Sequence, residues 1–369
     1  MLVLQTKDAT LKPHVEEPGR RRLGEPRNEI YFAWQARHAA EGAVRQAFVT
    51  GATGFLGGGL VRRLTSEGIG VKALVRPGSD TANLERHGAY VVRGSLMDEQ
   101  AVAALMRGCE VTYHLAGLTS RTSPTRGDCL RANVDVTERV ANAALIAGVK
   151  RFVHCSSAVV YGVIDKPPVD EASPTRSDSP YAESKVMGEE AIRRAHRLNG
   201  LPAIIARFPG VLGYGSVSWI GLLRAIGKGG FRLIGSGRNR THTVHVSDLL
   251  EGLTLCGTVP GIEGRTYNLA SDHPVTVSDL VNTIAAELGV TLSGMRLPAL
   301  PYAMLHRLNV LTYRSTGREL PRANTYELFL SDKVMDIARA RRDLGYAPTF
   351  TLAAGLRDTI RRHVELGEL

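Results

Sequence analysis

The chain has 369 residues, of which 43% are hydrophobic and 22% are charged. This composition excludes an intrinsically disordered chain and a small disulfide-stapled scaffold, and it suffices for one large domain or two ordinary ones. The 46 lysines and arginines exceed the 36 acidic residues by ten, and because the excess is spread along the chain, it favours an anionic cofactor or an arginine-rich proteome over nucleic acid.

Residues 1–45 are polar and rich in Glu, Arg and Pro, a composition typical of a flexible leader. From residue 46 onward, short apolar runs alternate with amphipathic segments, which is the pattern of βαβ units and a parallel sheet. Strands are predicted at residues 47–50, 71–75, 90–93, 111–115, 151–155 and 203–208. Helices are predicted between them at residues 57–67, 99–106, 130–147 and 182–198.

After Pro209 this alternation weakens, because glycines crowd the next segment and turns rather than strands separate the helices expected at 247–256 and 277–288. The predicted fold is therefore α/β: a doubly wound parallel sheet of the Rossmann type at residues 46–210. A smaller C-terminal substrate lobe is expected at residues 211–369, intertwined with the first domain.

Three glycines, Gly51, Gly54 and Gly57, follow the first predicted strand and open the first predicted helix. A pyrophosphate needs free backbone N–H groups at a helix N-terminus and close approach of the main chain, and glycines supply both. Glycine clusters are often mere turns, but the position between strand and helix favours dinucleotide binding.

The second strand ends in Arg76, with no acid at the position that usually accepts the ribose hydroxyls of the unphosphorylated cofactor. A guanidinium there can pair bidentately with a 2′-phosphate, so NADP(H) is favoured over NAD(H). The alternative is that Arg76 is only a solvated residue at a strand end.

Tyr181 and Lys185 stand four residues apart at the start of a predicted helix and so share one face. A nearby ammonium, together with a positive nicotinamide ring, is expected to lower the pKa of the tyrosine towards the range useful for acid–base catalysis. Ser157 follows the fifth strand at the sheet edge where α/β proteins place ligands, and its hydroxyl is predicted to bond a substrate oxygen. The alternative for Ser157 is a turn cap.

Several ordered motifs carry a resemblance over roughly residues 46–365. They are TGATGFLG at 50–57, HLAG at 114–117, Asn133, SSAVVYG at 156–162, YAESK at 181–185, YNLA at 267–270 and LGYAP at 344–348. With these residues the sequence resembles the extended short-chain dehydrogenase/reductase family, including NAD-dependent epimerase/dehydratases and 3β-hydroxysteroid dehydrogenase-like enzymes.

The resemblance implies a catalytic triad of Ser157, Tyr181 and Lys185, with Lys185 also holding the nicotinamide ribose. It further implies that Asn133 orders a water near Tyr181, although an ordinary buried amide is an alternative, and that the chain forms a homodimer. The cofactor-binding residues predicted in all are Gly51, Thr53, Gly54, Phe55, Leu56, Gly57, Arg76, Ser95, Leu96, Ala116, Gly117, Asn133, Tyr181, Lys185, Phe208 and Pro209.

Two departures from the family pattern bear on this transfer. Ser95 stands where the family usually has an aspartate that reaches the adenine, which leaves that contact open. Nucleotide-sugar members generally have an arginine at the position where this chain has Thr241, and Arg240 lies one residue away. Because a shift of one residue in a strand moves a side chain to the opposite face, Arg240 cannot be assumed to replace that arginine. A less charged substrate is therefore expected.

The four cysteines include no C-x-x-C pair, so neither a disulfide framework nor a metal site is expected. No run approaches the ~18 consecutive apolar residues of a membrane span. The apolar stretch 297–311 is broken by prolines; it is interpreted as core by default, with a substrate lid or a peripheral surface for a lipid-like substrate as alternatives. We expect a cytoplasmic protein without a transmembrane segment that binds a small-molecule substrate.

The sequence as a whole predicts an NAD(P)-dependent oxidoreductase that transfers a hydride at a secondary alcohol or ketone carbon. A nucleotide-sugar epimerase or dehydratase that uses the same triad is the first alternative. A non-catalytic cofactor-sensing protein is the second, and the intact Ser157, Tyr181 and Lys185 set argues against it.

Overall fold

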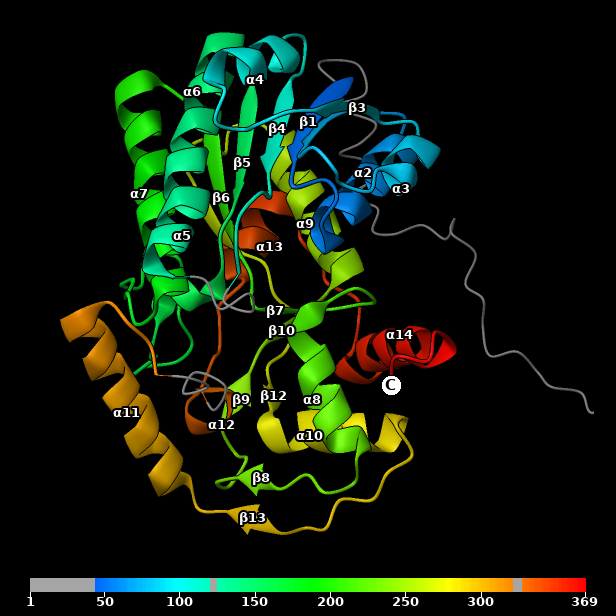
Figure 1. Cartoon of the computed structure of the whole chain (residues 1–369), viewed down its shortest axis with the longest axis vertical. Helices are drawn as coiled ribbons and strands as arrows, with labels where there is room; N and C mark the ends of the chain where they lie inside the picture. Colours follow the sequence, from blue (N-terminus) through cyan, green and yellow to red (C-terminus); the bar gives the residue numbers. More distant parts are fainter. Residues whose placement is uncertain (1–43, 120–124, 321–326) are drawn as a thin grey trace, which may run out of the picture. The chain divides into compact units, whose positions relative to one another are not determined.

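The computed structural model describes residues 44–119, 125–320 and 327–369 of the chain. Its central sheet has seven parallel strands in the order β11-β6-β5-β4-β1-β2-β3 (Figure 1). The strands are β1 (Gln46–Thr50), β2 (Gly70–Val75), β3 (Tyr90–Arg93), β4 (Val111–His114), β5 (Arg151–Cys155), β6 (Ala203–Arg207) and β11 (Thr266–Asn268). The six strands predicted from the sequence are confirmed, and each begins and ends within one residue of its predicted position.

Helices cover both faces of this sheet. On one face α4 packs against α6 and α6 against α7, whereas α2 packs against α9 on the other (Figure 1). Their bounds are α2 (Phe55–Ser66), α4 (Glu99–Met106), α6 (Val136–Ala147), α7 (Pro180–Asn199) and α9 (Val246–Thr258). The helix predicted at 130–147 begins earlier, because α5 (Arg126–Leu130) and a π-helical turn run directly into α6. Short α3 (Ala82–Arg86) was not predicted.

The core under the first of these helix layers is apolar. Phe48 and Phe152 of the sheet contact Met106, Val140 and Ile192 of the helices, and all five side chains are buried. Burying apolar surface contributes roughly 25 cal/mol per Å², so this alternation of strands and amphipathic helices specifies the layered fold.

Residues after Pro209 build a second region around small strands and helices. A separate buried cluster joins α8, α10 and α14 through Trp219, Leu223, Ile284 and Leu356. The elements here are β7 (Gly210–Leu212), α8 (Val217–Gly227), β8 (Leu233–Ile234), β9 (Arg240–Thr241), β10 (Thr243–His245), β12 (Val275–Thr276), α10 (Val277–Glu287), β13 (Arg296–Leu297), α11 (Ala299–Thr316), α12 (Glu327–Leu330), α13 (Ala338–Leu344) and α14 (Leu352–Glu365).

The two halves of the sequence are interleaved in space. Strand β11 pairs with β6 and completes the sheet at one edge, and α9 packs on the sheet, although both follow residue 210. The division of domains at residue 210 stays a prediction, and the predicted leader lies outside the described residues except for positions 44 and 45. Within the described residues, no helix combines the length and apolarity needed to cross a bilayer.

Candidate active site

The strand order reverses between β1 and β4, and the two strand ends lie side by side, with Thr50 opposite His114. The chain leaves β1 through Gly51, whose φ of +68° is the left-handed conformation that glycine adopts without strain. A Cβ at Gly51 would lie 2.8 Å from the Ala116 nitrogen, so glycine also lets the two loops approach each other. Parallel α/β sheets bind ligands in the crevice at this point.

Helix α2 starts at this crevice with Gly54 at its N-cap, and no side chain caps its first turn. The amides of that turn therefore point toward a site where an anion is favoured. Thr53 and Gly54 are exposed, and Leu56 is half-buried. A Cβ at Gly57 would lie only 2.1 Å from the Gly51 oxygen, so only glycine fits the closed turn. These features fit the pyrophosphate of a dinucleotide.

Phe55 connects this turn to the second half of the chain. Its ring lies so close to Gly213 and Gly215 that a Cβ on either glycine would be 3.2 Å from it. The aromatic ring therefore packs against the loop after β7 as well as lying at the start of α2. A contact between Phe55 and a cofactor stays a prediction.

Arg76, Ser95 and Leu96 lie at the ends of the two neighbouring strands. Arg76 is exposed directly after β2, and the Ser95 hydroxyl accepts a hydrogen bond from the Met97 amide at 3.2 Å. Leu96 is partly buried and packs against the apolar core rather than into solvent. Ser95 and Leu96 thus have local structural roles, and their contact with an adenine stays a prediction.

The segment after β4 is held by Asn133. This buried amide accepts a hydrogen bond from the Leu118 nitrogen at 2.8 Å and donates one to the Leu118 oxygen at 3.1 Å and one to the Ser184 hydroxyl at 2.9 Å. A Cβ at Gly117 would lie 2.5 Å from the Asn133 side-chain oxygen. The buried-amide alternative thus describes Asn133 in this structure, where it positions Gly117 and Leu118.

Lys185 lies beside this segment on α7. Its buried ammonium donates a hydrogen bond to the Cys155 carbonyl at 2.9 Å and would lie 3.7 Å from a Cβ at Gly117. Burial lowers the pKa of Lys185 from its ordinary value. The ammonium is thus fixed between the ends of β4 and β5.

Ser157 and Tyr181 meet at the end of β5. Ser157 precedes a 3-10 turn at Ala158–Tyr161, and its hydroxyl accepts a hydrogen bond from the Val159 amide at 3.4 Å, so its capping role is present. Burial raises the pKa of Tyr181 to about 12, and the neighbouring Ser157 hydroxyl acts in the opposite direction. The lowering expected from Lys185 together with a nicotinamide ring stays a prediction; in this structure desolvation dominates the pKa of Tyr181, and the Lys185 ammonium bonds the Cys155 carbonyl.

Ser157, Tyr181 and Pro209 line one large cavity of about 1910 Å³. The Phe208 oxygen accepts a hydrogen bond from the Ala158 amide at 2.9 Å and thereby ties the end of β6 to the turn after Ser157. Apolar and aromatic wall residues come from the second half of the chain; they include Trp219, Leu222, Phe231, Tyr302, Phe329 and Met335.

Three cations in the wall are paired with acids, and Arg232 and Arg318 also line the cavity as exposed side chains. Arg126 makes a bidentate contact with Glu183 at 2.6 Å, Arg314 pairs with Asp178 at 2.9 Å, and Lys333 pairs with Glu327 at 2.6 Å. Thr241 lines the cavity, whereas Arg240 on the same strand is exposed. The arginine one residue away does not replace the one expected of nucleotide-sugar enzymes.

Sequence reasoning missed a buried polar network behind the site. Glu189 accepts two hydrogen bonds from Arg207, at 2.8 and 2.6 Å, and one from the Ser156 hydroxyl at 2.6 Å. Arg207 also donates to the Tyr161 hydroxyl at 3.0 Å, which in turn donates to Asn268 at 2.7 Å. Glu189 lies four residues after Lys185 and therefore on the same helix face, and this spacing was the sequence signal that could have indicated the network.

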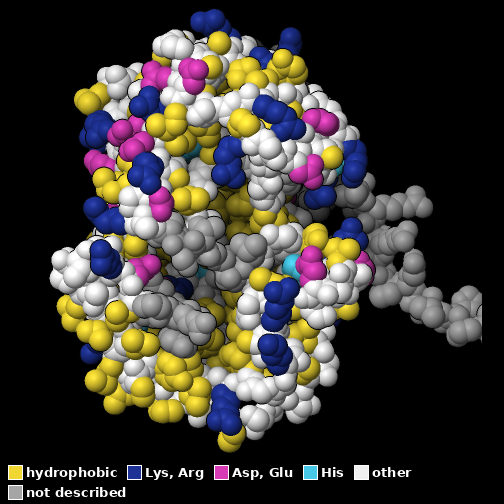
Figure 2. Space-filling view, viewed as in Figure 1, with side chains coloured by type: hydrophobic (Ala, Val, Ile, Leu, Met, Phe, Trp, Pro, Cys, Tyr) yellow, Lys and Arg dark blue, Asp and Glu magenta, His cyan; other side chains and the backbone are white. Residues whose placement is uncertain are grey.

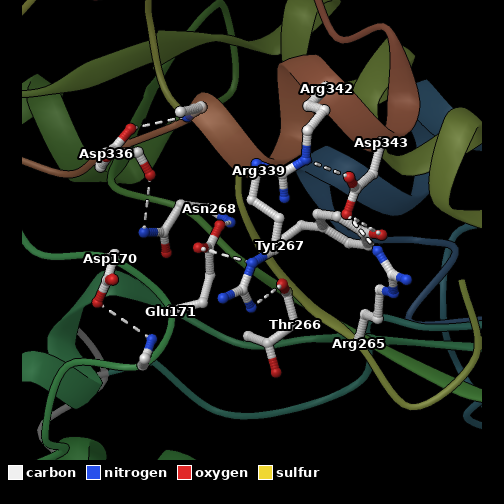
Figure 3. Close-up of polar contacts among 12 residues, drawn as sticks. Asp170, Glu171, Arg265, Thr266, Tyr267, Asn268, Asp336, Arg339, Arg342 and Asp343 are labelled. Atoms are coloured by element: carbon white, nitrogen blue, oxygen red, sulfur yellow. Dashed lines mark hydrogen bonds and ion pairs between the residues drawn. The ribbon is translucent and has the colours of Figure 1, made fainter.

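The network continues beyond Asn268 toward α13 (Figure 3). The backbone nitrogen of Asn268 donates a hydrogen bond to the Glu171 carboxylate at 2.9 Å, and Arg339 pairs with the same carboxylate at 3.3 Å. Arg265, which directly precedes β11, pairs with Asp343 of α13 at 2.7 Å. These contacts attach β11 and α13 to the loop that follows Ser157.

Comparisons with known proteins identify a family and related enzymes for this chain. A family model described as the NAD dependent epimerase/dehydratase family matches residues 47–270. A 4-hydroxy-2-methyl-3-oxo-4-farnesyl-3,4-dihydroquinoline-1-oxide ketoreductase from Stigmatella aurantiaca is 30% identical, with 88% of this chain and 98% of that protein covered. A 3 beta-hydroxysteroid dehydrogenase/Delta 5→4-isomerase from Mycobacterium tuberculosis is 28% identical, with 88% and 91% covered. The solved dTDP-glucose 4,6-dehydratase from Streptomyces venezuelae with NAD bound is 27% identical, with a TM-score of 0.70 and 87% and 97% covered.

Proposed function

The chain belongs to the NAD dependent epimerase/dehydratase family, and on this basis we propose that its reaction is net hydride transfer between NADP(H) and the secondary alcohol or ketone carbon of a largely apolar substrate. As an NAD(P)-dependent oxidoreductase of the extended short-chain dehydrogenase/reductase type, it shares its fold with enzymes of several chemistries. The observation that carries the proposal is that Ser157 and Tyr181 line the same large, mainly apolar cavity, with the buried Lys185 one turn after Tyr181 on α7.

The residues have distinct proposed roles. Tyr181, held protonated by its raised pKa, donates its phenolic proton to the substrate oxygen during ketone reduction. Ser157 orients that oxygen with its hydroxyl, and the fixed Lys185 ammonium favours negative charge nearby. A bound nicotinamide ring would supply or accept the hydride. Gly51, Gly54 and Gly57 would hold the pyrophosphate at the start of α2.

The substrate class rests on the cavity. Its volume of about 1910 Å³ exceeds the ~300–1,000 Å³ of ordinary ligand pockets, which supports a large substrate. Arg240 faces away from the cavity and so does not supply the arginine expected for a diphosphate, and the curated relatives include a ketoreductase whose substrate name contains a farnesyl group. Both points support an apolar ketone or alcohol.

The test follows absorbance of the reduced nicotinamide with a panel of apolar ketones. Tyr181→Phe should lower turnover by ~100-fold or more while NADPH binding persists. The control Tyr90→Phe alters an exposed tyrosine far along the sheet and should be silent. Turnover that survives Tyr181→Phe would refute the assigned proton donor. Product formation from a nucleotide sugar without net absorbance change would instead indicate an epimerase or dehydratase.

Cofactor preference is tested separately. The exposed Arg76 at the end of β2 supports NADP(H), because its guanidinium can pair with a 2′-phosphate. Arg76→Ala should weaken NADPH binding by about 10-fold or more and leave NADH binding nearly unchanged. Equal losses for both cofactors would remove this assignment.

A further inference from the structure

Helix α11 has two faces of opposite environment. Its inner face carries Tyr302, His306 and Tyr313 toward the cavity. Its outer face carries Leu300, Met304, Leu308 and Leu311, which we name the α11 stripe, with exposed fractions of 70%, 63%, 54% and 63%. Steps of four, four and three residues place these side chains on one side of a helix. The interpretation of this stretch as core is therefore wrong for half of the helix.

The stripe forms a continuous surface rather than scattered residues. Figure 1 shows α11 in orange at the edge of the second region, and Figure 2 shows hydrophobic side chains gathered over it. Single exposed residues such as Leu198 are common in soluble proteins, whereas contiguous apolar patches mark sites of interaction. Since the inner face already packs on the protein, fold stability does not explain the outer leucines.

Charge around the stripe identifies its partner. Residues 288–318 contain no aspartate or glutamate. Arg314 pairs with Asp178 and Arg318 lines the cavity, whereas Arg307 is exposed next to Leu308, and helical geometry places it at the border of the stripe. A second copy of the chain, docked stripe to stripe, would bring two Arg307 side chains toward each other and repel them.

We propose that the α11 stripe docks the protein on an anionic lipid surface. The apolar face of the helix enters the boundary between headgroups and acyl chains, and Arg307 at the border of the stripe contacts anionic headgroups. The docking itself does not depend on the proposed reaction. Tyr313 donates a hydrogen bond to Glu183 of α7, so the docked helix remains attached beside the cavity and separates it from the bilayer.

The experiment uses the full chain and vesicles of phosphatidylglycerol mixed with phosphatidylcholine. Binding, measured by co-sedimentation, should exceed that to pure phosphatidylcholine by ~10-fold or more and should weaken as salt is raised. The variant with Leu300, Met304, Leu308 and Leu311 all changed to Ser should bind at least ~10-fold less. A matched control changes four other exposed apolar residues to Ser and should bind normally; these are Met97, Met187, Leu198 and Leu366.

Each variant is checked for unchanged thermal unfolding and NADPH binding. Arg307→Glu should reduce binding to the anionic vesicles and leave that to phosphatidylcholine unchanged. Absence of binding to anionic vesicles, or equal binding by the stripe variant, would overturn the proposal. The proposal would also be overturned if sedimentation showed a dimer that depends on the stripe and the protein did not bind vesicles, since the partner would then be a second copy. Reductase activity on a soluble ketone, assayed without vesicles, bears only on the proposed function.

Discussion

Replacing Glu189 by alanine tests the buried network behind the candidate site. Glu189 is fully buried, as is Arg207, and the two groups form a bidentate pair with distances of 2.8 and 2.6 Å. Glu189 also accepts hydrogen bonds from Ser156 and from Arg193, which is one-third exposed. The substitution removes the only carboxylate that these three donors share, and the guanidinium of Arg207 stays behind in the interior.

The cost follows from that buried guanidinium. Breaking a buried pair by removing one partner destabilises a protein by about 3–5 kcal/mol, whereas a partly exposed pair such as that with Arg193 contributes about 0–1 kcal/mol. Glu189→Ala should therefore lower the free energy of unfolding by about 3–5 kcal/mol. The neighbouring guanidinium groups hold the pKa of Glu189 below its ordinary value, despite burial, so this stabilisation is present at neutral pH and is lost on acidification.

Urea unfolding followed by circular dichroism measures the effect. With an m-value of about 3 kcal/mol per M, the midpoint should fall by about 1–1.7 M in Glu189→Ala. Arg193→Ala serves as the matched control and should change the unfolding free energy by no more than ~1 kcal/mol. The double variant Glu189→Leu, Arg207→Met should be more stable than Glu189→Ala, because it leaves no unpaired charge. Equal midpoints for Glu189→Ala and Arg193→Ala would refute the reasoning.

Three further outcomes are expected. Gly57→Ala forces a Cβ to within 2.1 Å of the Gly51 oxygen and should weaken NADPH binding about 10–100-fold in calorimetric titration. In the control Gly58→Ala the nearest contact of the new Cβ would be 3.5 Å, so NADPH binding should be unchanged. Because burial raises the pKa of Tyr181 to about 12, the initial rate of ketone reduction should stay constant from pH 6 to about 9. The rate of alcohol oxidation, which needs the phenolate, should rise with pH. A reduction rate that halves near neutrality would contradict this assignment. Arg240→Ala should leave KM for an apolar ketone unchanged, since its side chain is exposed, and a large rise in KM would place that guanidinium at the substrate.

The central sheet was predictable because its strands are long enough to show a pattern. Strand β11 was missed: it has three residues, Thr266–Asn268, too few for periodicity to be read. Its place at the sheet edge depends on pairing with β6, which lies some sixty residues earlier in the chain. A short strand that owes its conformation to a distant partner leaves no local signal.

Helix α11 was missed for a different reason. Pro298 and Pro301 indicated a break, but the structure places Pro298 at the N-cap and Pro301 in the first turn. A proline is tolerated there, because the amide it lacks would have no partner within the helix. The same prolines that argued against a membrane span therefore mark the beginning of a helix.

Residue type and strand position place Gly51 after β1, Gly57 in the first turn of α2 and Ser157 after β5, as in the structure, and their roles in the site stay predictions. The pKa of Tyr181 could not be predicted in this way, because it depends on how deeply the phenol is buried and on what the Lys185 ammonium contacts. Helical spacing places two side chains on one face but does not determine the partner of a flexible lysine. Burial and hydrogen-bond partners are properties of the packed structure.

The register of β9 decides which side chain of that strand faces the cavity. Side chains alternate along a strand, so with Thr241 facing the cavity Arg240 faces away from it. Hydrogen bonds fix this register on both edges of β9. On one edge, Arg240 pairs with Thr276 of β12. On the other, the Arg240 amide donates to the Asp332 carboxylate at 2.6 Å and the Arg240 carbonyl accepts from the Lys333 amide at 2.7 Å. A slip of one residue would break these bonds and bring a guanidinium into the cavity, where a sugar-nucleotide diphosphate would be favoured. Because the bonds on both edges oppose that slip, Arg240 stays outside the cavity, which supports the proposed apolar substrate.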